Sequence, residues 1–423
     1  MQRGLRAVGL YTPQLRAWAL YDWANSTFAT TIMAAVLPVY YATVAGDSLA
    51  PNLRTAYWGY TATVALIIIA LISPVLGAVA DYLGARKRLL AGFLAMGVLA
   101  TACLYFVQRG EWLLASCLYV MGNVGFAAAN SFYESLLPHV ARPGEVDRVS
   151  TAGYAVGYIG GGVLLAINLA WIQFPSRFGI ESAAQASRLS FLSVALWWAV
   201  FSIPLFVRVA EPARLEPLAG DERHPLSVGL GSVVQTLGEL RQHRPAFMFL
   251  LAFWFYNDGI NTIIKMAAIY GAEVGLGQAD LIGALLLVQF IGVPCTFAYG
   301  ALASRIGAKR GIYIALGIYC GICVMGYFLR EAWHFWALAV AVGLVQGGSQ
   351  ALSRSFFATL IPRENSAQFF GFYSVSGKFG NIVGPSVFAA MSQLTGSGRY
   401  AILSLVFFFA VGALLLSRVD IDT

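Results

Sequence analysis

The stretch Gly77-Ala78-Val79-Ala80-Asp81-Tyr82-Leu83-Gly84-Ala85-Arg86-Lys87-Arg88 decides the fold, because it returns 223 positions later as Gly300-Ala301-Leu302-Ala303-Ser304-Arg305-Ile306-Gly307-Ala308-Lys309-Arg310. Both copies share the frame Gly-x-x-Ala-x-x-x-Gly-Ala followed by two basic residues, and both separate two long apolar runs. A chain of 423 residues that repeats itself at about half its length indicates an internal duplication. Duplicated proteins with many membrane spans are typically transporters that work between their two halves.

The composition favours lipid rather than water around this chain. Hydrophobic residues make up 59% and charged residues 11% of the sequence, whereas soluble domains carry about 45–50% apolar and about 25% charged residues. A membrane helix needs about 20 consecutive, mostly apolar residues. We therefore expect an all-α membrane protein with twelve transmembrane helices in two six-helix bundles. The expected spans are 14–44, 56–80, 89–108, 112–137, 149–173, 188–208, 246–271, 280–303, 311–329, 333–360, 367–394 and 399–417.

The first apolar run follows several arginines, as the core of a secretory signal does. It is too long for a cleaved signal and contains Asp22 and Asn25, so we expect it to be the first membrane helix. Basic residues concentrate on the cytoplasmic side of membrane proteins. Placing both termini in the cytoplasm puts most of the 27 lysines and arginines there. We expect a multi-pass protein of a bacterial-type inner or plasma membrane, and its net charge of +7 requires no nucleic-acid partner.

The longest polar stretch, 211–244, divides the chain into two parts. We expect an N-terminal six-helix bundle at 1–210, a cytoplasmic linker at 211–244 and a C-terminal six-helix bundle at 245–423. Apolar residues recur at helical spacing within the linker. This pattern predicts an amphipathic helix on the membrane surface, and a linker helix that only tethers the bundles is the alternative. The residues that form the pattern are Leu226, Leu230, Val233, Val234, Leu237 and Leu240.

The first copy of the repeated loop has residues suited to a latch. Gly84 permits a tight turn, Asp81 can meet a helix N-terminus, where the dipole favours negative charge, and the basic run that follows can anchor the loop at anionic lipid. The pattern Gly77-x-x-Ala80-Asp81-x-x-Gly84-x-Arg86-Lys87 resembles the signature after the second helix of the major facilitator superfamily. The resemblance implies that this loop latches the two halves together on the cytoplasmic side. The second copy has Ser304 in place of the aspartate, so we expect it to act mainly as a membrane anchor.

Two strings in corresponding helices point to one branch of that superfamily. The first helix contains Tyr21-Asp22-Trp23-Ala24-Asn25-Ser26-Thr27, and the seventh contains Tyr256-Asn257-Asp258-Gly259-Ile260-Asn261-Thr262. Both strings are similar to those of the vacuole-effluxer-like permeases, which are related to the autophagy-linked vacuolar amino-acid exporter of fungi. The resemblance implies an amino acid or related metabolite as the solute, and export as the direction.

Charged residues inside apolar runs are candidates for solute binding or ion coupling. A carboxylate at the bilayer centre costs at least about 2.5–3.5 kcal/mol, so such residues face a cavity or a partner. A zwitterion needs an anion for its ammonium and a cation for its carboxylate. The apolar runs contain both acidic and basic residues, which can provide these groups. The alternative is that Asp258 pairs with Lys265 or Lys378 and serves packing alone. The expected substrate or coupling residues are Asp22, Asn25, Asn130, Glu134, Asn257, Asp258, Asn261, Lys265 and Lys378.

Further residues are expected to control opening and closing. Glu134 in the fourth run and Arg354 in the tenth lie at equivalent depths, so they can form a gate between the halves, or each can reach toward water on its own side. Glycines four residues apart, Gly153, Gly157 and Gly161, let helices approach closely, and we expect them to let the halves slide. The expected gating residues are Gly77, Asp81, Gly84, Arg86, Lys87 and Arg354.

These features predict a secondary transporter that moves a small polar solute by alternating access, with protons as a coupling ion through Asp22 or Asp258. We expect a monomer whose other contacts are with membrane lipid. One alternative is export of amphipathic drugs or lipids, with the aromatic residues Trp254, Phe255, Phe290 and Tyr373 lining the cavity. A membrane receptor or scaffold is the alternative without transport.

Enzymatic, metal-binding and cofactor-binding sites are not expected. The sequence contains no Walker-type phosphate loop and no combination of residues typical of membrane-embedded transferases. The pair Cys320-x-x-Cys323 has metal-ligand spacing, but it lies within an apolar run and has no second pair to complete a site.

Overall fold

The computed structural model describes residues 6, 8–49, 51–212, 243–274, 278–379 and 383–419. All regular secondary structure in these ranges is helical. The amphipathic segment expected at 226–240 lies outside the described residues.

The helices of the N-terminal bundle end before the long polar stretch. They are α2 (Pro13–Thr27), continued by η1 (Phe28–Ala35), α3 (Val36–Tyr40) and η2 (Tyr41–Ala45); α4 (Pro51–Leu83); α5 (Arg86–Cys103), continued by η3 (Leu104–Phe106); α6 (Trp112–Ser135); α7 (Leu137–Val140); α8 (Val146–Gln173); η4 (Pro175–Phe178); and α9 (Ala183–Arg208). The helices of the C-terminal bundle are α11 (Arg244–Glu273), α12 (Gln278–Ile306), α13 (Ala308–Tyr327), α14 (Ala332–Leu360), α15 (Ser366–Phe379), α16 (Val383–Thr395), α17 (Gly398–Ser404) and α18 (Val406–Ser417).

Eleven helical segments of the described chain are long and apolar enough to cross a membrane. The expected span at 367–394 is described instead as two shorter helices, α15 and α16, on either side of residues 380–382.

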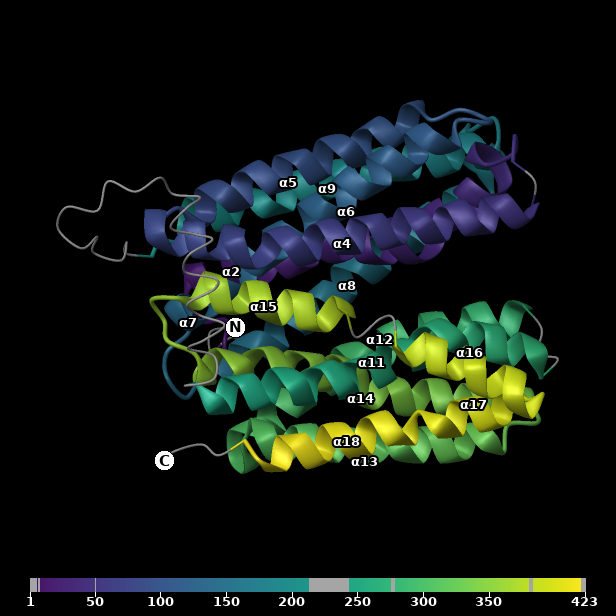
Figure 1. The fold of residues 1–423 in the computed structure, drawn as a ribbon. Coiled ribbons are helices and arrows are strands. Elements are labelled where there is room, and N and C mark those ends of the chain that lie inside the picture. The colour runs from purple at the N-terminus through teal and green to yellow at the C-terminus, as the bar shows by residue number, and fades with distance from the viewer. Residues whose placement is uncertain are drawn as a thin grey trace.

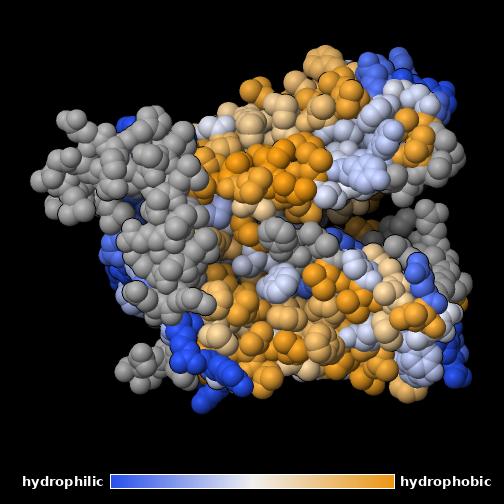
Figure 2. All heavy atoms as spheres, in the orientation of Figure 1, coloured by the Kyte–Doolittle hydropathy of each residue, from blue (hydrophilic) through white to orange (hydrophobic). Residues whose placement is uncertain are grey.

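The two bundles lie one above the other, with α15 between them (Figure 1). The helix α15 packs against α4 and α6 of the N-terminal bundle, while α8 packs against α12 and α14 of the C-terminal bundle. The helix α2 begins, and α18 ends, at the same end of the molecule, which we call the terminal end; it is on the left in Figure 1. At the opposite end, the space-filling view is hollowed between the bundles (Figure 2).

The face of the two bundles seen in Figure 2 is apolar over its middle. Leu71 of α4 and Val207 of α9 are each 70% exposed, and Phe407 of α18 is 62% exposed. Water would penalise such a surface, whereas lipid tails solvate it. The exposure therefore fits a protein surrounded by a bilayer.

The glycine-rich face of α8 packs within its own bundle, which corrects the expectation that it lets the halves slide. A Cβ on Gly157 would meet the Ser26 hydroxyl and the backbone of Asp22 on α2, and one on Gly161 would meet Thr30. Only Gly153, among these three, also approaches the C-terminal bundle, at the Arg354 guanidinium. Sequence spacing identified a close helix contact, but spacing alone does not say which neighbouring helix makes it.

The duplication is visible at the two repeated loops. Gly84 and Gly307 both adopt positive φ, +57° and +85°, which only glycine adopts without strain. The Lys87 ammonium donates hydrogen bonds to the carbonyls of Phe206 and Val209, at the end of α9. The Lys309 ammonium likewise donates to the carbonyls of Ser417 and Val419, at the end of α18. Each loop thus places a cation at the negative C-terminal end of the last helix of its bundle.

The α2–α8 contact generates a matched pair of substitutions. A Cβ at position 160 would overlap the Trp23 carbonyl oxygen, whereas a Cβ at position 162 would meet nothing within 4 Å. We expect Gly160→Ala to lower stability by about 1–3 kcal/mol, as overpacking does. Gly162→Ala should be neutral or slightly stabilising, because alanine is the better helix former. Thermal unfolding of the purified protein in detergent measures both; equal midpoints would contradict this packing.

Candidate functional site

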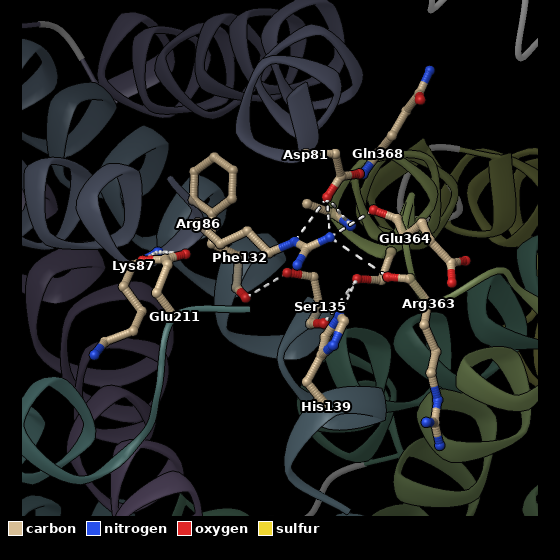
Figure 3. Close-up of polar contacts among 12 residues, drawn as sticks. Asp81, Arg86, Lys87, Phe132, Ser135, His139, Glu211, Arg363, Glu364 and Gln368 are labelled. Atoms are coloured by element: carbon tan, nitrogen blue, oxygen red, sulfur yellow. Dashed lines mark hydrogen bonds and ion pairs between the residues drawn. The ribbon is translucent and has the colours of Figure 1, made fainter. Parts of the chain in front are cut away.

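The carboxylate of Asp81, at the end of α4, caps the N-terminus of α15 in the other bundle (Figure 3). Its oxygens accept hydrogen bonds from the backbone N–H groups of Ala367 at 3.2 Å and Gln368 at 2.8 Å. These are the second and third residues of α15, where N–H groups have no partner within the helix. The contact expected from the sequence, an aspartate at a helix N-terminus, is therefore present and joins the two bundles.

Arg86 completes this contact. Its guanidinium donates from Nε to the Asp81 carboxylate at 2.8 Å and from Nη2 to the Glu364 carbonyl at 2.7 Å. Arg86 and Asp81 are 1% and 3% exposed. Breaking a buried ion pair by removing one partner costs about 3–5 kcal/mol. Removing either partner would therefore leave a buried charge without a counter-charge and weaken the contact between the bundles at the terminal end.

Gly77 is required where α4 meets α15. A Cβ at this position would overlap the Ala367 carbonyl oxygen. One turn further along α15, Gly371 meets the backbone of Ser73 in the same way. Close backbone approach of this kind is typical of small residues at helix interfaces, and it brings Asp81 within hydrogen-bond distance of α15.

A second set of polar contacts lies beside this cap. The Ser366 hydroxyl, at the start of α15, donates to the Ser135 carbonyl at 3.0 Å and contacts the His139 ring nitrogen Nε2 at 3.2 Å. Both partners, Ser135 and His139, are labelled in Figure 3 and belong to the N-terminal bundle, so Ser366 adds a further link between the bundles. We call the contacts of Asp81, Arg86 and Ser366 with the opposite bundle the α15 latch.

The second copy of the loop makes different contacts. The Ser304 hydroxyl donates to the Ala301 carbonyl of its own helix, and Ser304 is exposed. Lys309 holds the end of α18, within the C-terminal bundle. The asymmetry expected from the sequence is therefore present in the contacts: the described cap between bundles belongs to the first copy.

A second ion pair between the bundles lies deeper. The Arg354 guanidinium of α14 donates from Nη1 and Nη2 to the Asp22 carboxylate of α2, each at 3.2 Å. Tyr133 donates to the same carboxylate oxygen at 2.8 Å. Arg354 also donates to the hydroxyl and the carbonyl of Ser150 on α8, at 2.9 and 2.8 Å. Both charged groups are buried and hydrogen-bonded on several sides, as stable burial of charge requires.

Aromatic rings enclose the Arg354 guanidinium. It lies 4.2 Å from the centre of the Tyr154 ring and 4.9 Å from that of Trp18. Arginine over an aromatic face gains cation–π attraction, about 2 kcal/mol or more where water is excluded. Trp18 in turn stacks on Tyr133, with ring centres 4.6 Å apart. Sequence reasoning missed these residues and Ser150, because neither an aromatic nor a serine in an apolar run is distinctive on its own.

The structure gives Arg354 a different hydrogen-bonded partner from the one considered in the sequence. Its ion pair is with Asp22, whereas Glu134 is half-buried and its charge acts on Arg354 at longer range. Further from the terminal end along α2, the Asn25 amide donates to the Asn130 side-chain carbonyl of α6 at 2.5 Å. Four of the expected polar residues of the N-terminal bundle, Asp22, Asn25, Asn130 and Glu134, thus come from the facing helices α2 and α6.

The expected residues of α11 lie in the C-terminal bundle and face α15 and α16. The Asn257 amide donates to the Gly377 carbonyl of α15 at 3.1 Å. Asp258 accepts from the Gly384 N–H of α16 at 2.7 Å. Asn261 is half-buried and Lys265 is exposed, and no ion pair between Asp258 and Lys265 is formed within the described residues. The side chain of Lys378 lies outside the described part.

The two clusters are connected through α14. Ser353, next to Arg354, shares a 2.6 Å hydrogen bond with the Tyr256 hydroxyl of α11. Tyr256 directly precedes Asn257 and Asp258. The helix that carries the cation of the deeper ion pair therefore also contacts the polar segment of α11.

The α15 latch predicts that substitutions of two neighbouring arginines, Arg86 and Arg88, have different effects on stability. Lysine cannot reproduce the guanidinium fork that joins Asp81 to the Glu364 carbonyl. We expect Arg86→Lys to lower stability by about 1.5–3 kcal/mol, the range for hydrogen bonds to charged groups. Arg88→Lys is the matched control, because Arg88 is exposed. Thermal unfolding in detergent compares the two, and an unchanged midpoint for Arg86→Lys would count against the latch.

Comparisons with known proteins agree with this architecture. A family model described as "Vacuole effluxer Atg22 like" matches residues 50–423. The Bacillus subtilis (strain 168) protein YxiO, described as an uncharacterized MFS-type transporter, is 38% identical over 98% of this chain and 96% of its own length. Autophagy-related protein 22-1 of Penicillium rubens is 23% identical over 97% of this chain and 90% of its own.

Solved structures show the same fold. The transporter FucP in its outward conformation aligns with a TM-score of 0.73 at 12% identity, covering 98% of this chain and 100% of that one. The proton:xylose symporter XylE aligns with a TM-score of 0.72 at 13% identity, covering 96% and 95%. The repeated loop, the helical bundles and these likenesses agree, and the chain belongs to the Atg22-like vacuole effluxer family of major facilitator superfamily transporters.

Proposed function

We propose that this transporter is a secondary active carrier that works by alternating access and that the structure represents its outward-open conformation. The support is the position of the contacts between bundles. The α15 latch closes the terminal end, whereas the opposite end is hollowed between the bundles (Figure 2). The terminal end carries the basic loop at 86–88, so by the positive-inside rule it is the cytoplasmic end.

The proposal extends to the topology. The helices α15 and α16 together form one span, which with the eleven apolar segments makes twelve. The chain then consists of the two six-helix bundles at 1–210 and 245–423, joined by the linker at 211–244, with both termini in the cytoplasm. It works as a monomer in contact with membrane lipid.

The solute we propose is a small zwitterion, such as an amino acid or a related metabolite. One observation carries this: the ion pair of Asp22 and Arg354 places a carboxylate and a guanidinium together between the bundles. An ammonium can replace the guanidinium on Asp22, and a carboxylate can replace Asp22 on Arg354, so a zwitterion satisfies both groups as the pair separates. Asn25 and Asn130, which lie further from the terminal end, supply neutral hydrogen bonds to the same solute. The effluxer family name favours export.

An amphipathic cargo has less support. The Tyr373 ring is stacked against Phe253, with centres 4.4 Å apart, and against Phe357 at 5.1 Å. Phe290 is 66% exposed. Two of the aromatic residues expected to line a cavity for such a cargo are therefore engaged in packing or directed outward.

Flux in proteoliposomes tests the zwitterion proposal. We expect the wild-type protein to exchange radiolabelled amino acids, and Asp22→Asn to slow this exchange by at least about tenfold, which corresponds to 1.4 kcal/mol. Asp47→Asn is the control, because Asp47 lies outside the spans and pairs with the exposed Arg109. Wild-type protein that exchanges no amino acid, or an Asp22→Asn variant as fast as wild type, would contradict the proposal.

The same vesicles test proton coupling separately. An imposed pH gradient should accelerate net uptake of the exchanged amino acid by the wild-type protein. Uptake that is independent of the gradient would reject proton coupling and leave the carrier assignment intact.

A further inference from the structure

Asp258 stands out among the buried carboxylates of the described residues because one of its oxygens is itself buried without a hydrogen-bond partner. Oδ2 accepts the Gly384 N–H at 2.7 Å, which caps the N-terminus of α16. Oδ1 has no hydrogen-bond partner in the described part of the chain, although Asp258 is only 1% exposed. A buried carboxylate without a partner costs several kcal/mol if it stays charged, so such a group is neutralised instead.

The contrast with Asp81 shows what is different at Asp258. Both aspartates cap the N-terminus of a helix: Asp81 caps α15, and Asp258 caps α16. Asp81 has both oxygens in hydrogen bonds and the Arg86 guanidinium as a counter-charge. Asp258 has the same kind of cap on one oxygen and no ion pair within the described residues. The partial positive charge of a helix N-terminus, about half an elementary charge, offsets only part of its negative charge.

The surroundings of Oδ1 are fixed by tight packing. A Cβ on Gly384 would lie 2.7 Å from Oδ1 and would overlap the Thr262 hydroxyl. That hydroxyl donates to the backbone carbonyl of Asp258, so it does not serve Oδ1. From α18, Phe408 and Phe409 pack against the adjacent Gly259. The charged group that faces Asp258 from its own helix is Lys265, seven residues away and about 10 Å along the axis.

We propose that Asp258 is the site at which the transporter binds and releases its coupling proton. The proton is carried on Oδ1, while Oδ2 continues to accept the Gly384 N–H. It enters from the hollowed end of the molecule and leaves to the other side once the bundles have rearranged. A proton needs only the one free oxygen, whereas a metal cation requires several oxygen ligands. This inference deepens the proposed function, because it assigns the coupling ion to Asp258 rather than to Asp22, which is held by Arg354 and Tyr133.

The cap on α16 gives the proton a mechanical effect. A hydrogen bond to a carboxylate is roughly twice as strong as one to a neutral carboxyl group. Loss of the proton therefore tightens the hold of α11 on α16, and binding of the proton loosens it. The neighbouring segment α15 is held by the α15 latch, so the two aspartates act on the two parts of one proposed span.

Infrared spectroscopy of the purified full-length protein in lipid nanodiscs tests this assignment without any solute. We expect the C=O stretch of a protonated carboxylic acid, shifted in D₂O, which disappears on raising the pH and is absent in Asp258→Asn. Asp81→Asn is the matched control and should retain the band. Asparagine keeps a carbonyl oxygen for the Gly384 N–H, so Asp258→Asn preserves the cap. A spectrum of Asp258→Asn identical to wild type would overturn the proposal.

Two further experiments distinguish a proton from a sodium ion at Asp258, and the assignment of Asp258 from the carrier proposal on which it rests. If sodium chloride, but not choline chloride, removes the band at constant pH, the site takes Na⁺ and the proton assignment is wrong. In proteoliposomes, Asp258→Asn should still exchange amino acids at a measurable rate but lose its response to a pH gradient, whereas the control Asp47→Asn should keep that response. An Asp258→Asn variant that still responds to the gradient would also overturn the assignment. Failure of the carrier proposal would abolish exchange in the wild type and leave the infrared result intact.

Discussion

The rest of the structure depends on one contact, the carboxylate of Asp81 at the N-terminus of α15 in the opposite bundle. It satisfies N–H groups that would otherwise lie buried without partners, and Arg86 both neutralises the carboxylate and holds the carbonyl before α15. Gly77 and Gly371 permit the backbones to approach closely enough for this geometry. This contact closes one end of the molecule, while the opposite end is hollowed between the bundles (Figure 2), and the proposed alternating-access function rests on this difference.

The deeper ion pair and the α15 latch have different physical characters. The latch combines an ion pair with backbone hydrogen bonds, so its parts separate together. The pair of Asp22 and Arg354 is surrounded by aromatic rings and hydroxyl groups, and in the proposed function it is the part that the solute meets. A buried ion pair gains little over apolar packing in net stability, so it can be exchanged for contacts with a charged solute at small net cost. A carrier needs such near balance, because large differences between its states would trap one of them.

Much of this arrangement could be predicted from the sequence, and the rest could not for a physical reason. The repeated frame, the apolar runs and the need of Asp81 for a partner are local properties, and the structure has the expected cap. The partner of Arg354 is not local: 332 positions separate it from Asp22. Helical spacing gives the face on which a residue lies but not the neighbour that the face meets. The same limit applied to the glycines of α8, which pack on α2, and to Asp258, whose contact is the start of α16.

The most direct test of the central claim is the distance between the bundles at the terminal end. Spin labels at Arg88 and Arg363, both exposed and on opposite sides of the α15 latch, report it by pulsed electron paramagnetic resonance. The account predicts a short distance in the otherwise wild-type protein and a second, longer population in Asp81→Asn, with Ser304→Ala unchanged. An unaltered distance in Asp81→Asn, or the same change in both variants, would contradict it.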